Sequence, residues 1–404
     1  MGINLIKRNK MIEIKNKYKN ILLNDIIPFW SKYSVDWKYN GFLNYLDQDG
    51  SVYCTDKSVW IQNRGVWLFS KLYNEVEPKD EWLNIAKNGF KFIMEHCFDT
   101  NDQEGRMFFS VTQNGKPLRK RRYYFTETFG AIAFAEYAIA TNSQIALEKA
   151  RTIYRLIIDF YRNNSLQVSP KINPQTRLTK THAVPMIILA TTQCLRKIDN
   201  NPLYDEISGI IVNEIFKDFF KEDEHALFET VGINGERLDS PQGRCINPGH
   251  AIETSWFLME EGRYRNDENL INKACQVLDW SLNWGWDEKF GGILYFVDVE
   301  SRPPEQLEWD MKLWWPHTEA LYATLLAYKL TKNDKYKIWH KRIHEWAFSH
   351  FPDKQYGEWF GYLHRDGSIS LKLKGNLWKG PFHLPRALLL CWKLLDEMLQ
   401  NNAI

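Results

Sequence analysis

Hydrophobic and polar positions follow two different periods along the chain. Apolar residues recur every three or four positions over 58–74 and 81–97, and again over 311–330 and 334–351, which predicts two pairs of helices. Between such pairs the residues alternate as short strand pairs do, and several of these segments contain an Asn-Gly or Asp-Gly dipeptide typical of a hairpin turn. The turn dipeptides are Asn114-Gly115, Asn234-Gly235 and Asp366-Gly367. We therefore expect helix pairs joined by short β-hairpins.

The hairpin segments recur at a nearly constant interval. Three of them share an aspartate, an aromatic residue, a glycine and an alternating aromatic run, as in DWKYNGFLNYLDQDG, DEKFGGILYFVD and DKQYGEWFGYLHRDG. These copies begin at Asp36, Asp287 and Asp353, and weaker copies begin at Asp102 and Asp223. Neighbouring copies lie 64 or 66 residues apart, and the one gap of 121 residues is about two intervals, with NNSLQVSPKINPQTR from Asn163 in its middle. The chain therefore consists of six repeated units.

Two helices in each of six units give twelve helices and no sheet large enough to form a core. This favours one all-α domain over residues 1–404, a closed (α/α)6 barrel of six helical hairpins with short β-hairpins at the active-site end. An open solenoid is the alternative, but its hairpins would share no common cavity. Residues 1–10 precede a second methionine, Met11, and we expect them to be disordered or to mark an alternative start.

Composition narrows the class of protein. Hydrophobic residues make up 44% of the 404 positions and charged residues 25%, which is sufficient for a large core. The formal charge of +2 argues against a nucleic-acid or membrane-surface binder, and no apolar run or secretory signal marks a membrane or export segment. The six cysteines lack metal-ligand spacing, so we expect free thiols in a reducing cytoplasm. Aromatic residues reach 15%, which suits core packing first and sugar stacking second.

The segment after each hairpin starts a helix, and in a closed barrel these six helix starts converge at one end. They carry charged and aromatic groups where an inner helix would otherwise have small apolar residues. In NPGHAIETSW, Asn247 suits the N-cap, Pro248 the first turn, and Gly249 a close approach of backbone to a ligand. The groups at the six starts are Trp60, Arg64, Glu127, His182 to Met186, His250, Glu253, Trp256, Trp315, His317, Glu319, His383 and Arg386.

Two other patterns have simpler explanations. His340 and His344 have the i, i+4 spacing of metal ligands, but Lys341 and Arg342 lie between them, so we expect a solvated face of an outer helix and no metal site. The basic run Lys116, Arg119, Lys120, Arg121 and Arg122 is expected to be a solvated hairpin strand and not a nucleic-acid patch.

Several segments resemble the N-acylglucosamine 2-epimerase family, also known as renin-binding proteins. They are WIQNRGVW, HAVPMIIL, GRCINPGHAIETSWFLMEEG, LEWDMKLWWPHTEALYATLLAY, YGEWFGYLHRDGSISLKLKG and KGPFHLPRALLLC. The resemblance runs in order from about Asn24 to Leu399. It implies an (α/α)6 barrel, in agreement with the repeat count.

The resemblance also implies a reaction and its residues. Epimerisation at carbon 2 of an open-chain aldose removes a proton from one face and returns one to the other, and histidine suits both roles near neutral pH. The resemblance places the two histidines at His250 and His383, an oxyanion-stabilising arginine at Arg64, and at Glu319 a group that holds a sugar hydroxyl or orients a histidine. The implied substrate-binding residues are Trp60, Glu127, Met186, Glu253, Trp315, His317, Trp378 and Arg386.

The same resemblance implies the substrate and setting. Related cellobiose and mannose enzymes tend to carry an extra histidine on the third inner helix and a glutamine at the position of His317. Here Met186 and His317 favour N-acetylglucosamine and N-acetylmannosamine, and hence a role in sialic acid metabolism. A cytoplasmic homodimer is implied, with no metal or redox cofactor required and ATP as an activator that is not consumed.

Three alternatives remain open at this stage. One is another 2-epimerase or aldose–ketose isomerase of the same superfamily, acting on mannose or cellobiose. Another is a glycoside hydrolase that uses Glu253 and Glu319 as paired carboxylates. The last is a binding or regulatory protein with an inactive site, although such a protein has no need for two opposed bases.

Overall fold

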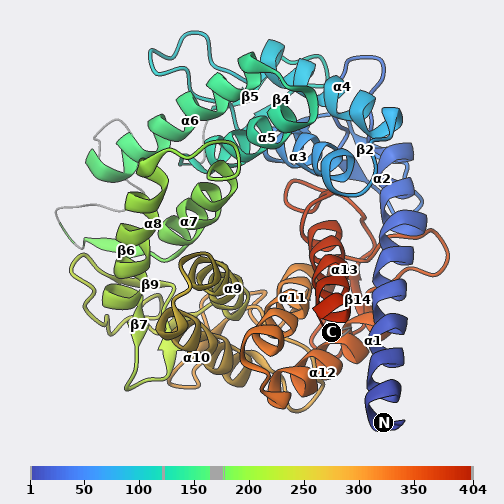
Figure 1. Ribbon diagram of the computed structural model, residues 1–404. Coiled ribbons are helices and arrows are strands. Elements are labelled where there is room, and N and C mark those ends of the chain that lie inside the picture. The colour runs from blue at the N-terminus through green and yellow to red at the C-terminus, as the bar shows by residue number, and fades with distance from the viewer. Residues whose placement is uncertain (1, 121–122, 164–175, 177, 402–404) are drawn as a thin grey trace.

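The computed structural model, which describes residues 2–120, 123–163, 176 and 178–401, is a ring of helix pairs around a central axis (Figure 1). Six inner helices line the axis and six long helices lie outside them, which confirms the predicted (α/α)6 barrel. The inner helices are α3 (Val59–Glu75), α5 (Phe125–Thr141), α7 (Ala183–Leu195), α9 (Pro248–Arg265), α11 (Trp314–Thr331) and α13 (His383–Asn401). The outer helices are α4 (Asp80–His96), α6 (Gln144–Asn163), α8 (Pro202–Glu214), α10 (Glu268–Gly285), α12 (Asp334–His350) and α1 (Gly2–Ile21).

The two ends of the chain together make the sixth helix pair. Helix α1 packs along α13, and a π-helical turn over Leu22–Ile26 and the short α2 (Ile27–Tyr33) lead into the first hairpin. Tyr18 and Leu22 are fully buried, and Lys15 forms an ion pair with Asp396 of α13 at 2.9 Å. Residues 2–10, which were expected to be disordered or to mark an alternative start, form the first turns of α1, and the later turns of this helix close the barrel.

Inner and outer helices differ in the number of faces that they bury. Every residue of α11 from Trp314 to Ala327 is buried, because the helix contacts α12 on one side and faces the barrel axis on the other. The outer helix α4 has an apolar stripe towards α3 and a charged outer face. Polar groups on the inner helices are therefore removed from bulk water, and each needs a partner or a function.

Short strands tie neighbouring units together at one end of the barrel. In four units the strand that precedes an inner helix pairs antiparallel with the strand that follows the next outer helix: β3 with β4, β6 with β9, β10 with β11, and β12 with β13. The hairpin expected from Asn163 lies outside the described residues. The strands are β1 (Tyr45–Leu46), β2 (Val52–Cys54), β3 (Lys57–Ser58), β4 (Ser110–Val111), β5 (Pro117–Arg119), β6 (Thr179–Thr181), β7 (Phe220–Lys221), β8 (Ala226–Leu227), β9 (Thr230–Gly232), β10 (Cys245–Ile246), β11 (Val297–Asp298), β12 (Lys312–Leu313), β13 (Tyr362–Leu363) and β14 (Ile369–Leu371).

The aspartate that opens each strong repeat copy is structural. Asp36 accepts hydrogen bonds from the backbone of its own turn and forms an ion pair at 2.9 Å with Lys57, which is fully buried. Asp287 pairs in the same way with Lys312, and Asp353 with Lys374. Each pair joins the turn of a hairpin to the segment that leads into an inner helix, which is strand β3 for Lys57, strand β12 for Lys312 and the loop before α13 for Lys374. The repeated aspartate therefore preserves the rim of the barrel.

One position of the predicted repeat differs in the structure. In the weaker copy at Asp102, the position equivalent to Asp36 is Asp99, whose backbone N–H donates to the carbonyl of Arg106 as that of Asp36 does to Gly41. Of the basic run, Lys116, Arg119 and Lys120 are exposed on or beside β5, as expected, and Arg121 and Arg122 lie outside the described residues.

The expected solvated face at His340 and His344 was wrong. His340 is buried because helix α1 covers this side of α12, and the Tyr18 hydroxyl lies 3.0 Å from its Nε2 and 2.8 Å from His344 Nδ1. Its Nδ1 lies 3.0 Å from the carbonyl of Leu321. Burial lowers the pKa of His340 to about 4, so the pair forms a neutral structural contact that holds α1 in place.

All six cysteines are unpaired, as expected. Among the described residues, no helix combines the length and the apolar character that a membrane crossing demands.

Candidate active site

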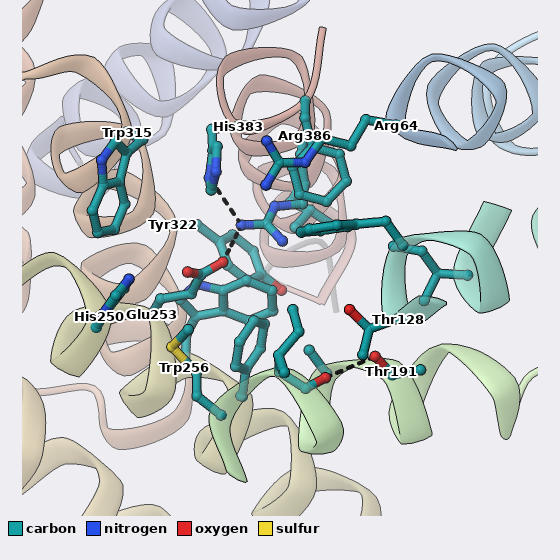
Figure 2. Close-up of a pocket in the computed structure, with 18 of the residues that line it drawn as sticks. Arg64, Thr128, Thr191, His250, Glu253, Trp256, Trp315, Tyr322, His383 and Arg386 are labelled. Carbon is teal, nitrogen blue, oxygen red and sulfur yellow. Dashed lines mark hydrogen bonds and ion pairs between the residues drawn. The ribbon is translucent and has the colours of Figure 1, made fainter. Parts of the chain in front are cut away.

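A cavity of about 1220 Å³ lies along the barrel axis, and its lining reaches from the strands to the far ends of the inner helices. Figure 2 shows part of its wall. Side chains from all six inner helices line it. Most of the residues proposed from the sequence reach this cavity, namely Trp60, Arg64, Met186, His250, Glu253, Trp315, Trp378, His383 and Arg386.

His383 begins α13 with one ring nitrogen held and the other free for chemistry. Its Nδ1 lies 2.8 Å from Glu319 Oε1, and Arg386 donates to the same oxygen at 2.7 Å. Burial, together with the positive charges of Arg386 and Arg64, holds the pKa of His383 well below its usual value. His383 is therefore a neutral imidazole, and Glu319 orients it, which is one of the two roles expected for that residue.

His250 is held by a residue that sequence reasoning missed. Asn247 caps α9 by accepting from the backbone N–H of His250 at 3.0 Å, and the ring Nδ1 lies 3.1 and 3.2 Å from the two carboxylate oxygens of Glu229. Burial lowers the pKa of His250, but the charge and hydrogen bond of Glu229 outweigh it, so the pKa is raised. Glu229 lies in the weak repeat copy from Asp223, and nothing in that segment marks it as different from a solvated hairpin carboxylate.

The two histidines lie on either side of one tryptophan. The Trp315 ring centroid is 5.3 Å from that of His250 and 5.7 Å from that of His383. Figure 2 shows both imidazoles at the cavity wall, one from α9 and one from α13. A small planar substrate in front of Trp315 can thus be approached by two imidazoles from different directions.

Arg64 lies in an aromatic pocket beside these groups. Its guanidinium carbon lies 4.1 Å from the ring centroid of Phe129 and 4.8 Å from that of Phe382, and Nη1 donates to the Trp378 carbonyl at 3.3 Å. Within the described part of the chain no carboxylate forms an ion pair with Arg64. Burial and the nearby Arg386 lower the pKa of Arg64 to about 9, and a bound anion would relieve both effects. Arg64 is therefore suited to stabilise a developing oxyanion.

Arg386 binds two carboxylates of the cavity, Glu253 and Glu319. It donates to Glu253 Oε1 at 2.5 Å and to Glu319 Oε1 at 2.7 Å. Glu253, Glu319 and His383 place ligand atoms within 4.8 Å of one another, but the guanidinium already neutralises both carboxylates. A glycosidase needs two carboxyl groups that reach the glycosidic bond, and here one guanidinium binds both carboxyl groups.

Two residues predicted to bind substrate do not reach the cavity. Glu127 is buried in the first turn of α5, on a side that does not line the cavity, where it accepts hydrogen bonds from Arg106 Nε at 3.0 Å and from the Met107 backbone N–H at 3.1 Å. His317 is fully buried against α12, and its ring accepts from the Ile293 N–H at 2.9 Å and lies 2.7 Å from the carbonyl of Leu313. Both stand at helix starts as predicted, but the rotation of each helix about its axis turns them away from the cavity.

A helical barrel whose axial cavity holds two histidines, each with a carboxylate on Nδ1, has the arrangement of an enzyme that works by acid–base catalysis. A model of the N-acylglucosamine 2-epimerase (GlcNAc 2-epimerase) family matches residues 41–384. The N-acylglucosamine 2-epimerase of Bos taurus is 34% identical over 94% of this chain and 91% of its own length. The cellobiose 2-epimerase of Dictyoglomus turgidum is 25% identical over 92% of this chain and 96% of its own length.

Solved structures give the same fold. The cellobiose 2-epimerase from Spirochaeta thermophila superimposes with a TM-score of 0.84 at 21% identity, covering 97% of this chain and 99% of that one. The chain belongs to the N-acylglucosamine 2-epimerase family, and it is an isomerase of the epimerase type.

Proposed function

We propose that this enzyme interconverts N-acetylglucosamine and N-acetylmannosamine by moving a proton at carbon 2. The observation that carries the proposal is the pair His250 and His383, which face one cavity from two helices with a carboxylate on Nδ1 of each. That arrangement leaves both Nε2 atoms for the substrate and lets one imidazole act as base while the other acts as acid.

The steps follow from these positions. In the open-chain aldehyde, the base removes the proton from carbon 2, and the electron pair of the broken C–H bond delocalises into the carbonyl to give an enolate. Arg64, which has no carboxylate partner among the described residues, stabilises the negative oxygen. The other imidazole then donates a proton to the opposite face of carbon 2, and the carbonyl forms again.

The cavity wall supports a pyranose-sized, partly apolar substrate. Trp60, Trp315 and Trp378 present aromatic surface at the mouth, and the buried Met186 lines the cavity with its thioether chain. An acetamido methyl group beside Met186 would meet an apolar surface, whereas a bare hydroxyl would lose its hydrogen bonds to water there. The curated relatives at 32–34% identity are N-acylglucosamine 2-epimerases, which supports the same choice.

Proton NMR in deuterated water tests this proposal. The enzyme is incubated separately with N-acetylmannosamine, N-acetylglucosamine, mannose and cellobiose, and the signal of the carbon-2 hydrogen is followed. We expect deuterium to enter the epimeric product of the two N-acetyl sugars, with His250→Ala and His383→Ala folded but inactive. Exchange with mannose or cellobiose alone would overturn the substrate assignment, and a histidine variant that keeps near-normal turnover would overturn the mechanism.

Three further features belong to the proposal. The proposed chemistry uses only side chains of this protein, so we propose that no metal or redox cofactor is required. We further propose that ATP activates the enzyme without being consumed. We also propose a cytoplasmic homodimer that serves sialic acid metabolism. Turnover with ATP after extensive treatment with a chelator, with ADP formation measured in parallel, tests the first point, and sedimentation at several protein concentrations tests the dimer.

A further inference from the structure

The two histidines of the cavity have the same kind of partner but opposite electrostatic surroundings. We propose that Glu229 is the positioning residue of His250, that it makes His250 the imidazole that carries a proton in the free enzyme, and that Arg386 denies the same state to His383. For the epimer whose carbon-2 hydrogen faces His383, His250 then begins the reaction as the acid and His383 as the base. This inference rests on the proposed function and adds a residue and an order of proton transfer to it.

Glu229 lies nearer to His250 than to His182, the other histidine beside it. Its two oxygens lie 3.1 and 3.2 Å from His250 Nδ1, so the carboxylate fixes the ring and directs Nε2 away from itself. Behind it lies His182, whose Nδ1 is 3.9 Å from Glu229 Oε2 and whose Nε2 is 2.9 Å from the hydroxyl of Thr254. Burial lowers the pKa of His182, which stays neutral and does not cancel the carboxylate charge.

The remaining groups that face His250 reinforce this state. Glu253, on the same helix, adds negative charge, and His383 across the cavity is neutral. Within the described residues, the ion pairs of Glu229 involve only the two histidines. A carboxylate whose neighbours are imidazoles stabilises a proton on the nearer one, since the imidazolium is then the only full positive charge available to it.

The partner of His383 is placed differently. Glu319 lies 2.8 Å from His383 Nδ1, but it also accepts from Arg386 at 2.7 Å and from Trp256 Nε1 at 2.9 Å. Arg386 itself lies 3.4 Å from His383 Nδ1.

Other charges around His383 point the same way. The positive charge of Arg64 from α3 and any proton on His250 oppose a second positive charge here, whereas Glu253 and Glu319 favour one. Because Arg386 binds the same Glu319 oxygen, Glu319 orients the His383 ring but stabilises a charge on it less than Glu229 does on His250.

This difference sets the first proton transfer for the epimer whose carbon-2 hydrogen faces His383. The carbon-2 hydrogen moves as a proton to Nε2 of neutral His383, and the C–H electron pair forms the enolate. The Nε2 proton of His250 moves to the opposite face of carbon 2 as the carbonyl forms again. The enzyme is left with a proton on His383 and none on His250, and it returns to its starting state when His383 releases a proton to water and His250 takes one up. In the reverse reaction the two histidines exchange roles, and the less populated form with its proton on His383 reacts.

A titration of the free enzyme tests the electrostatic half of the proposal. Two-dimensional ¹H–¹⁵N spectra of enzyme labelled at histidine, assigned with His250→Ala and His383→Ala, report the pKa and protonation state of each ring. We expect Glu229→Gln to lower the pKa of His250 by about 1–3 units and to leave His383 unchanged. An unchanged His250 titration in this variant would overturn the proposal. No substrate is present, so the result stands whether or not the proposed function holds.

Kinetics test the catalytic half. The two histidines share one proton in either direction of the reaction. The decrease of kcat/KM at high pH should therefore follow the pKa of His250 in both directions. In Glu229→Gln that limb should move to lower pH by the shift seen in the spectra, so that kcat falls more at pH 8 than at pH 6 while KM changes less. The matched control is Glu224→Gln, which removes a carboxylate paired with Arg237 at 3.0 Å on the neighbouring hairpin and should keep the wild-type profile.

A conservative variant separates positioning from folding. Glu229→Asp keeps the charge on a shorter side chain, so its pH profile should resemble that of the wild type even where kcat is reduced. If Asp and Gln lower kcat equally at every pH with no shift of the basic limb, Glu229 is merely structural and the proposal fails. If Glu229→Gln does not fold, the Asp variant and the wild-type titration still decide it, because a wild-type His250 that is neutral at pH 7 contradicts the assignment.

Discussion

His317 allows structure to be separated from function, because one substitution can keep its hydrogen bonds and remove a group that binds a proton in the unfolded chain. His317→Gln can accept from the Ile293 N–H through its side-chain oxygen and donate to the Leu313 carbonyl through its amide nitrogen, as the imidazole does at 2.9 and 2.7 Å. We expect the variant to fold and to retain near-normal kcat and KM, because His317 does not line the cavity.

The magnitude of the effect on stability follows from the depressed pKa of this group. Burial lowers the pKa of His317 to about 3 from the ordinary value of 6.5. The unfolded chain therefore binds the proton first as the pH falls, and the unfolding free energy decreases below pH 6.5 until the folded pKa is reached. Between pH 7 and pH 5 the loss from this one group is about 2 kcal/mol.

Urea unfolding of both proteins at pH 7, 6 and 5 measures this contribution. The other histidines titrate alike in the two proteins, so the difference between the two pH slopes isolates His317. We expect the wild type to lose about 2 kcal/mol more than the variant over this range. Parallel slopes, or a folded variant with a 100-fold lower kcat, would refute the structural assignment and restore His317 to the substrate site.

Three other substitutions test the structure. Arg64→Met should lower kcat about 100- to 1,000-fold with a smaller change in KM, measured as initial epimerisation rates, because it removes the cation assigned to the oxyanion; an unchanged kcat would exclude that role. Lys57→Met leaves the buried Asp36 uncompensated and should cost about 3–5 kcal/mol of unfolding free energy in urea titrations, and a loss below 1 kcal/mol would show that water reaches the pair. Tyr18→Phe removes the hydroxyl 3.0 Å from His340 Nε2 and should cost about 1–3 kcal/mol, with faster proteolysis of helix α1; protection equal to that of the wild type would contradict the docking role.

Much of the site could be predicted because its residues stand at equivalent places in a repeat. The interval of about 65 residues located the helix starts, and nine of the twelve residues proposed at the site line the cavity, while Glu319 holds His383 from behind. Glu127 and His317 were misplaced, because position along the sequence gives the start of a helix but not its rotation about its own axis. A rotation of about 100° per residue decides whether a side chain meets the cavity or the neighbouring helix layer.

The sequence by itself determined the fold class and the number of helix pairs, because apolar periodicity and repeat spacing are properties of the chain alone. The resemblance to a family added the prediction of the two histidines. Only the tertiary structure decided what surrounds each histidine. Glu229 lies 21 residues before His250, and Glu319 lies 64 before His383. Such distances carry no local signal, since the contacts form only when neighbouring units close into a ring. The acidity of each imidazole depends on charges within a few ångströms in space, and those charges come from different repeats.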